Sequence, residues 1–256
     1  MTVDALQIKA YLDRIGCEFT RPDRENLARL QNAHLFAVPY ENLDILKNIP
    51  IKLDEASLFD KIVTRRRGGY CFEVNNLFGI LLRALGYEVK DLAARYLRGE
   101  EGVPMRRHHV LKVSCEDGVY LCDVGVGEPL PMEPVPYLTK EPFTDSFGGV
   151  YFFREDEFLG YVLCEEYKGG TRDVISFAEE NWVNADYATI SFWCERSPDS
   201  FFNKDIILAI RQRPNARITL SGHTMHTFKD GYFEEKVLTD EELDKEIKDT
   251  FGIAEY

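Results

Sequence analysis

Three arginines and two glycines lead directly into an amphipathic helix, and a cysteine stands at the junction. The segment from Arg65 to Gly86 reads RRRGGYCFEVNNLFGILLRALG. Its apolar residues after Phe72 recur at steps of three, one and four, the spacing of one buried helix face. Gly86 suits the left-handed conformation in which helices commonly end. The pattern therefore predicts a helix that begins near Cys71 and ends before Gly86.

The position of Cys71 favours a reactive thiol. Unpaired N–H groups and the positive end of the macrodipole at a helix start stabilise a thiolate. The three preceding arginines would act in the same direction if they pointed inward. The alternative is a small buried residue without reactivity, a common fate of free cysteine. A catalytic role requires a base and a group that orients the base.

A predicted hairpin downstream supplies both groups. The segments His108–Cys115 and Val119–Gly127 have the pattern of two strands, and the pair Asp117-Gly118 between them is a turn signal. Asp123 is an acid within an otherwise apolar strand. A buried carboxylate is costly without a partner, and a histidine N–H is a suitable one. The chain thus carries the order cysteine, histidine, aspartate of a thiolate–imidazole pair with an orienting carboxylate.

Strand register distinguishes the two adjacent histidines. If Asp117-Gly118 forms a two-residue loop, Asp123 faces Lys112, which shares a sheet face with His108. His109 then points to the opposite side. This register leaves His108 four residues along from Asp123, so a direct contact needs a bulge or a staggered strand. Parity therefore favours His108 as the base, with His109 as the alternative.

The chain resembles the arylamine N-acetyltransferases, a family of cysteine acetyltransferases that use acetyl-CoA. The most specific matching element is Arg67-Gly68-Gly69-Tyr70-Cys71-Phe72-Glu73. The first half of the chain matches well and the second half loosely. Further matching segments occur in family order: Tyr11–Gly16, Phe36–Leu43, the histidine strand, Asp123–Gly127, Ser197–Phe201 and Phe251–Ile253.

The resemblance implies a role for each matching site residue. Cys71 would be the acetylated nucleophile, His108 the base, because it precedes the aspartate by the family's fifteen residues, and Asp123 the orienting carboxylate. Contacts to the cofactor would come from Arg67, Gly125 and Gly127, and the acceptor pocket would include Phe36 and Val126. Val126 stands where the family usually has an aromatic residue. The N–H of Phe72 at the helix start is our hypothesis for an oxyanion donor.

The implied reaction is a ping-pong acetyl transfer. The Cys71 thiolate attacks acetyl-CoA, CoA leaves, and a small aromatic amine or hydrazine then takes the acetyl group, with His108 accepting its proton. A cysteine hydrolase or transglutaminase-like enzyme uses the same order of residues and is the second hypothesis. The third is a binding protein that retains only the fold.

The chain divides into three predicted parts, which together give an α+β fold. Residues 1–89 form a helical bundle that carries the nucleophile, and Asp23 is a plausible N-cap of its second helix. Residues 90–200 contain short alternating strands typical of a β-barrel, which carries the base and the carboxylate. Residues 201–256 form an α/β lid, with a helix expected at Lys204–Arg211, strands at Ala216–Leu220 and Thr224–Phe228, and a terminal helix to Thr250.

Composition excludes several other classes. The net charge of −13 makes nucleic acid an unfavourable partner, although arginines flanking the predicted site could attract the CoA phosphates. The six cysteines lack Cys-x-x-Cys spacing, which argues against zinc and against a disulfide framework, and a catalytic thiol suits a reducing cytoplasm. We expect no metal, no membrane-spanning segment and no secretory signal. His223 and His226 are expected to be surface strand residues.

Overall fold

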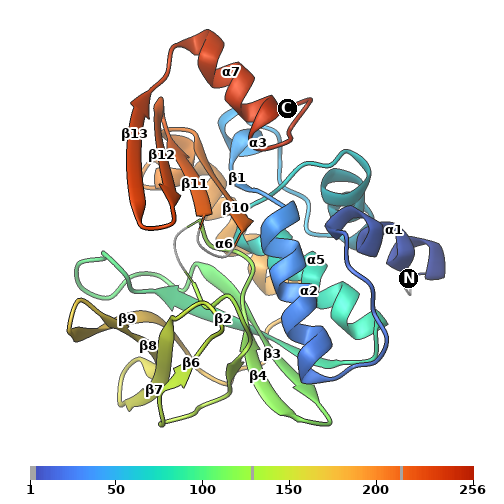
Figure 1. Ribbon diagram of the computed structural model, residues 1–256, viewed down its shortest axis with the longest axis vertical. Coiled ribbons are helices and arrows are strands. Elements are labelled where there is room, and N and C mark those ends of the chain that lie inside the picture. Colours follow the sequence, from blue (N-terminus) through green and yellow to red (C-terminus); the bar gives the residue numbers. More distant parts are fainter. Residues whose placement is uncertain (1–3, 128–129, 214–215) are drawn as a thin grey trace.

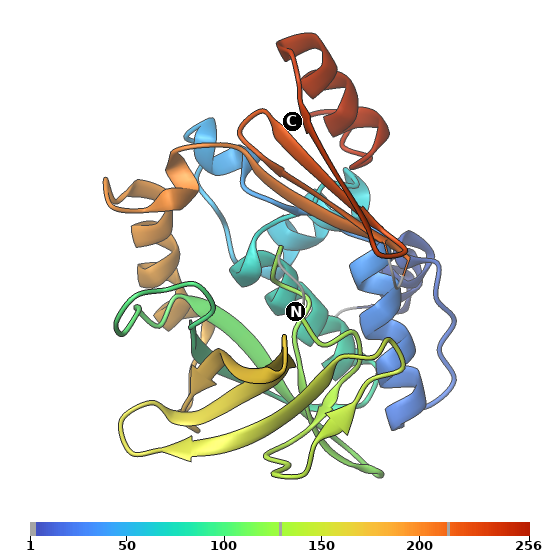
Figure 2. The ribbon, with the colours of Figure 1, turned by 60° about the vertical axis from the view of Figure 1, so that its left-hand side comes forward.

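The computed structural model describes residues 4–127, 130–213 and 216–256, and its helices and two sheets meet around one central helix. That helix, α5 (Cys71–Ala84), runs through the middle of the molecule, with the larger sheet on one side and the smaller sheet on the other (Figures 1 and 2). Nearly all of its residues are buried. The α+β architecture predicted from the sequence, with a helical part, a barrel-like sheet and an α/β lid, is confirmed.

The N-terminal part is helical, as predicted. Asp4 and Asp23 cap the first two helices through side-chain bonds to backbone N–H groups, which confirms Asp23 as an N-cap. The cap of α5 is Tyr70, whose own N–H is bound by the Glu73 carboxylate at 3.2 Å. The elements of this part are α1 (Ala5–Ile15), α2 (Arg24–Ala37), β1 (Tyr40–Glu41), α3 (Leu43–Leu46), α4 (Glu55–Phe59), a π-helical turn (Asp60–Thr64) and α5.

An antiparallel sheet of eight strands, curled toward a barrel, follows α5 (Figure 1). The short strands expected within residues 90–200 are present near residues 89, 110, 119, 151 and 161. Three further strands complete the sheet: β5 and β6 lie at its two edges, and β9 joins β8 to β2. Listed in sheet order, the strands are β5 (Val135–Pro136), β4 (Gly118–Cys122), β3 (His108–Cys115), β2 (Glu88–Tyr96), β9 (Gly170–Phe177), β8 (Gly160–Tyr167), β7 (Val150–Asp156) and β6 (Phe143–Thr144).

The turn of the β3–β4 hairpin lies one residue earlier than predicted, which shifts the pairing of its strands by two residues. Cys115 pairs with Gly118, so the two-residue loop is Glu116-Asp117 and not Asp117-Gly118. Gly118 takes the positive φ of 138° inside the strand, which a glycine tolerates at little cost. Extending the observed register by one residue places Asp123 opposite Val110, one alternate position from His108. The observed register therefore brings Asp123 two residues closer to His108 than the predicted register does, and the two side chains meet without a bulge.

The C-terminal part forms the second sheet, and one expectation for it was wrong. The segment Lys204–Arg211 is not a helix, because β10 (Ile207–Arg213) pairs with β1 and β11. A short apolar run fits either structure, and these distant partners decide in favour of a strand. The sheet order is β1, β10, β11 (Ala216–Ser221), β12 (Thr224–Lys229) and β13 (Tyr232–Val237), and α6 (Asn184–Arg196), a 3₁₀ turn (Phe201–Asn203) and α7 (Asp240–Asp249) complete the chain.

Strand β1 joins the lid to the helical part. Tyr40 pairs with Ala209 in β10 and also forms a parallel bridge to Gly69, two residues before α5 begins. Asn42 extends the connection by donating from Nδ2 to the carbonyls of Phe202 and Asp205 at 2.7 and 2.8 Å. Residues that lie far apart in sequence are thereby fixed around the start of α5. In the described ranges, no helix combines the length and the apolar character that crossing a bilayer requires.

Candidate active site

Cys71 is the first residue of α5 and is 2% exposed. Its Sγ donates to the carbonyl oxygen of Arg107 at 3.7 Å, and it lines a cavity of about 380 Å³ together with His108. Tyr70, the preceding residue, is anchored by a hydrogen bond of 2.5 Å between its hydroxyl and Ser191 Oγ in α6. The helix start is thus held from both sides while the thiol faces open space.

Opposing effects act on the pKa of the Cys71 thiol, and the helix-start position is only one of them. Burial raises the pKa of Cys71 well above its usual value, whereas hydrogen bonds from the backbone N–H groups of His109 and Phe72 lower it. The arginines before Cys71 do not turn toward the sulfur. Arg65 and Arg66 are exposed, and Arg67 is buried against Glu41 and Asp44. Formation of the thiolate therefore depends on proton transfer to a neighbouring base.

His108 and Asp123 form the buried pair that the sequence indicates. Nε2 of His108 lies 2.5 Å from Oδ2 of Asp123, and the two residues are 3% and 6% exposed. Since Nε2 faces the carboxylate, Nδ1 is the ring nitrogen left for chemistry in the cavity. His109 faces the opposite side of the sheet, where its Nε2 lies 2.9 Å from Oδ1 of Asp91 and its ring stacks on Tyr187. The two histidines therefore face opposite sides of the sheet, as strand parity predicts.

Asn75 is a site residue that the sequence reasoning missed. Its Nδ2 donates to Asp123 Oδ1 at 2.8 Å and to the His109 carbonyl at 2.6 Å, while its Oδ1 accepts from the Val124 N–H at 2.9 Å. Asn75 thereby ties α5 to β3 and to the segment that follows β4. A signal was present in the sequence: a polar residue four positions after Cys71, which places it on the same side of the helix as the cysteine.

Gly125 allows the strand segment after Asp123 to lie against the helix start. A Cβ atom at position 125 would meet Asn75 Nδ2 at 2.4 Å and the Cys71 Cα at 2.8 Å. The Gly125 N–H in turn donates to Asp123 Oδ1 at 2.8 Å. With the Asn75 amide, this N–H occupies one carboxylate oxygen of Asp123 and leaves the other for His108.

The remaining predicted residues divide between the cavity and other places. Gly125, Val126 and Gly127 line the cavity with Cys71 and His108, and aromatic and polar side chains complete it: Tyr40, Tyr96, Phe201, Phe202, Glu100, Arg107 and His226. Phe36 is partly buried against the hydrophobic core and lies outside this lining. Arg67 is likewise absent from the lining, because its guanidinium is bound to Glu41 and Asp44. The expectation that His223 and His226 are surface strand residues holds only in part. His223 is exposed but lies in the turn between β11 and β12, paired with Asp240, whereas His226 lies in β12, is partly buried, pairs with Glu235 and lines the cavity.

A network of buried charges lies beneath the helix start. Lys61 Nζ contacts Asp44 and Glu73 at 2.7 Å each, and Arg67 contacts Glu41 and Asp44 at 2.8 and 2.9 Å. Burial raises the pKa of Glu73 to about 7, partly offset by Lys61. Removing one partner from such a network leaves an uncompensated buried charge, so these residues fix the loop before Cys71.

The comparisons agree with this site. A family model described as N-acetyltransferase matches residues 23–254. The chain is 33% identical to arylamine N-acetyltransferase of Mycolicibacterium smegmatis, over 90% of this chain and 85% of that protein. It is 30% identical to the Salmonella typhimurium arylamine N-acetyltransferase / N-hydroxyarylamine O-acetyltransferase, over 90% and 82%.

Solved structures show the same similarity in three dimensions. The Salmonella typhimurium arylamine N-acetyltransferase superposes with a TM-score of 0.90 at 28% identity, over 96% of this chain and 90% of that one. The Mycobacterium marinum enzyme in complex with CoA gives 0.88 at 32% identity, over 96% and 92%. Fold and site thus define an N-acetyltransferase with a cysteine at a helix start. The chain belongs to the arylamine N-acetyltransferase family.

Proposed function

We propose that this enzyme transfers an acetyl group from acetyl-CoA to an arylamine or arylhydrazine through an acetyl-Cys71 intermediate. One observation carries the proposal: Cys71 and His108 line the same cavity, and Nε2 of His108 lies 2.5 Å from the Asp123 carboxylate. The family to which the chain belongs is defined by acetyl transfer to arylamines.

In the first stage, His108 takes the proton from Cys71 and the thiolate attacks the acetyl carbonyl. The resulting imidazolium is stabilised by Asp123, which also keeps the ring oriented. The backbone N–H groups of Phe72 and His109, which act to lower the pKa of Cys71, are the proposed donors to the developing oxyanion. Collapse of the intermediate expels CoA as its thiol, which receives the proton from His108, and leaves the thioester on Cys71.

In the second stage, the amine attacks the acetyl-Cys71 carbonyl and His108 accepts the amine proton. The same donors serve the second oxyanion, and the Cys71 thiolate is released. Cys71 and His108 are only 2% and 3% exposed, so bulk water has little access to the acetyl-cysteine. An acetyl-cysteine shielded in this way favours transfer to an amine over hydrolysis.

Acetyl-CoA fits the residues that line the cavity as a co-substrate. Arg107, which lies over the Phe201 ring at 4.8 Å and is paired with Glu100, is the cation of this lining and the proposed contact for a CoA phosphate. Gly125 and Gly127 keep the wall beside Cys71 free of side chains, so that an acyl chain can approach. The CoA complex of the Mycobacterium marinum relative supports the same donor. A reducing cytoplasm, which would keep Cys71 as a thiol, is the proposed setting, with no role for nucleic acid.

Intact-protein mass spectrometry after mixing with acetyl-CoA tests the proposal. Wild-type protein should gain one acetyl group that an added arylamine or hydrazine removes, and Cys71→Ala should gain none. Cys194→Ala is the matched control, because Cys194 is another buried cysteine. An acetyl adduct on Cys71→Ala would show that a residue other than Cys71 is the nucleophile. The absence of any adduct on the wild type would instead favour a cysteine hydrolase with the same triad.

A further inference from the structure

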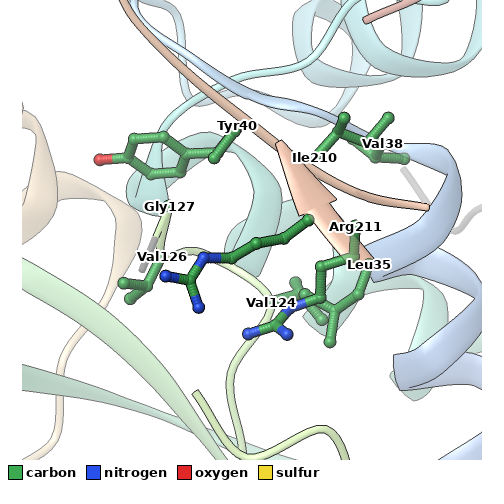
Figure 3. A pocket seen from close by; sticks show the side chains of 10 residues that line it. Leu35, Val38, Tyr40, Val124, Val126, Gly127, Ile210 and Arg211 are labelled. Atoms are coloured by element: carbon green, nitrogen blue, oxygen red, sulfur yellow. The ribbon is translucent and has the colours of Figure 1, made fainter. Parts of the chain in front are cut away.

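The start of α5 is supported from two sides by different parts of the chain. On one side lies the segment after β4, where a Cβ atom on Gly125 would meet the Cys71 Cα at 2.8 Å. Figure 3 shows the same segment, at Val126, below the Tyr40 ring of β1. On the other side lies α6, which meets the start of α5 through the side chain of Tyr70. This second support contains buried polar groups to which the reaction assigns no role.

Tyr70 is the N-cap residue of α5 and begins a chain of buried hydrogen bonds. Its hydroxyl lies 2.5 Å from Ser191 Oγ, and Ser191 Oγ donates to Glu195 Oε1 at 2.9 Å. Since a serine hydroxyl has one proton, which Ser191 donates to Glu195, the Tyr70 hydroxyl is the donor to Ser191. The other carboxylate oxygen, Glu195 Oε2, accepts from the Ile51 N–H at 3.1 Å. The side chains of Tyr70, Ser191 and Glu195 are all buried, so water has little access to the chain.

The Tyr70 ring packs against two residues that belong to the site. Its centroid lies 5.4 Å from that of the Phe72 ring and 5.4 Å from that of the Phe202 ring, in edge-to-face contacts. Phe72 carries a proposed oxyanion donor, and Phe202 lines the catalytic cavity. The backbone N–H of Tyr70 is bound as well, by Glu73 Oε2 at 3.2 Å. Hydroxyl, ring and backbone of Tyr70 are therefore all fixed directly before Cys71.

We propose that Tyr70 is a positioning residue of the acetyl transfer, held in place by Ser191 and Glu195. The hydrogen-bond chain sets where α5 begins and so directs the Phe72 N–H toward the oxyanion. Such a donor must lie about 3 Å from the charged oxygen, and a misplacement of about 1 Å costs roughly 100-fold in rate. The cavity lining among the described residues includes none of the three side chains of the chain, so they act through the start of α5. The inference rests on the proposed function and adds to it the residues that orient its oxyanion donor.

Two reactions of Cys71 separate this role from general support of the fold. Acetylation by acetyl-CoA passes through an oxyanion, whereas alkylation by iodoacetamide needs the thiolate but forms no oxyanion. We would measure both rates at one pH, on the folded fraction, for wild type, Tyr70→Phe and Ser191→Ala. Each variant should lose about tenfold to 100-fold in single-turnover acetylation and little in alkylation. Equal losses in the two reactions, or an unchanged acetylation rate, would overturn the inference.

Ser176→Ala is the matched control for Ser191→Ala. Ser176 is also buried, and its hydroxyl has no hydrogen-bond partner in the part of the chain that the structure describes. Neither rate should change in this variant, and an equal loss of acetylation would assign the effect to the loss of any buried hydroxyl. Glu195→Gln, which keeps an acceptor oxygen for Ser191, should acetylate at a rate between those of wild type and Ser191→Ala.

The double variant tests whether Tyr70 and Ser191 act as one chain. Tyr70→Phe and Ser191→Ala remove the same hydrogen bond from its two ends, so the combination should acetylate Cys71 no more slowly than the slower single variant. Losses that multiply would show that the two residues act separately, and the chain would be wrong. Tyr70→Phe retains the ring and the backbone contacts, so it decides the matter even if Ser191→Ala fails to fold.

Hydrogen exchange separates this inference from the proposed function. Loss of the chain should speed amide exchange at the start of α5, residues 70–74, in Tyr70→Phe and Ser191→Ala but not in Ser176→Ala. This measurement needs no turnover. A wild type that forms no acetyl-Cys71, while the two variants show faster exchange there, would contradict the acetyltransferase function alone. A wild type that forms acetyl-Cys71 no faster than Tyr70→Phe does would contradict the positioning role alone.

Discussion

Asn75 and Asp123 are joined by a hydrogen bond of 2.8 Å from the amide Nδ2 to the carboxylate Oδ1. The other carboxylate oxygen, Oδ2, faces His108 at 2.5 Å. One asparagine on α5 therefore fixes the orientation in which the Asp123 carboxylate meets His108 on β3. Asn75 is 0% exposed, so water cannot replace its amide without a rearrangement of the core.

Asn75→Ala should lower both stability and rate. Three hydrogen bonds are lost, at a cost of about 3 kcal/mol in the free energy of unfolding. We also expect kcat to fall about 100-fold, because a carboxylate free to turn no longer fixes the His108 ring. Urea unfolding and steady-state kinetics on the folded fraction would measure the two effects.

Asn76→Ala is the control for this prediction. Asn76 is the next residue of α5, is also buried, and donates only to the Leu53 carbonyl at 3.0 Å. Its loss should cost about 1 kcal/mol of stability and leave kcat of the folded enzyme unchanged. Equal losses of kcat in the two variants would mean that Asn75 acts through general stability and not through Asp123.

Asp123→Asn should impair acetylation of Cys71 much more than it impairs folding. The amide preserves the shape of the side chain but favours the wrong tautomer of His108 and cannot stabilise the imidazolium. A loss of about 10³–10⁴ in rate is expected from triad chemistry. Single-turnover acetylation followed by mass spectrometry measures it. Asp91→Asn, in the similar pair with His109, should change this rate by less than about tenfold, and a comparable loss there would make His109 a candidate for the base.

The elements with strong local periodicity were predictable from the sequence. The start of α5 at Cys71, the Asp23 cap and the hairpin strands follow from residue spacing and capping chemistry, which depend on near neighbours. Parity alone also selected His108 over His109. The family resemblance then supplied the roles, which spacing cannot provide.

Features fixed by distant partners were not predictable. Arg67 lies four residues before Cys71 in sequence, but its direction is set by Glu41 and Asp44, which are 26 and 23 residues away. The apolar run of β10 became a strand because β1 and β11 pair with it. The hairpin register depended on whether Gly118 stood in the loop or in the strand, and both suit a glycine.

Gly125→Ala should disrupt the site by steric overlap. The added methyl group would stand 2.4 Å from Asn75 Nδ2 and 2.8 Å from the Cys71 backbone, so the strand or the helix start must move. We expect a loss of about 3 kcal/mol in unfolding free energy and almost no acetylation of Cys71. Gly127→Ala provides the comparison, with nearest atoms at 3.2 and 3.4 Å, and should cost less than about 1 kcal/mol. Similar stabilities for the two variants would show that the segment after Asp123 adapts freely.

The charge network beneath the helix start should impose a measurable pH dependence on stability. The pKa of Glu73 is raised from 4.5 to about 7, chiefly by burial. The folded protein therefore binds a proton at Glu73 more tightly than the unfolded chain does. The contribution of this group is fully present below pH 4.5 and is lost as the pH rises through 7, with an upper limit of about 3 kcal/mol.

Glu73→Gln isolates this contribution, because the glutamine does not titrate. Urea unfolding of both proteins between pH 4.5 and 8 gives the difference in unfolding free energy. In that difference the other groups cancel, including His34, whose pKa burial lowers to about 3 and which acts with the opposite sign. We expect the stability of the wild type to fall relative to Glu73→Gln across this range. A flat difference would mean that Glu73 remains ionised throughout, held by Lys61 at 2.7 Å.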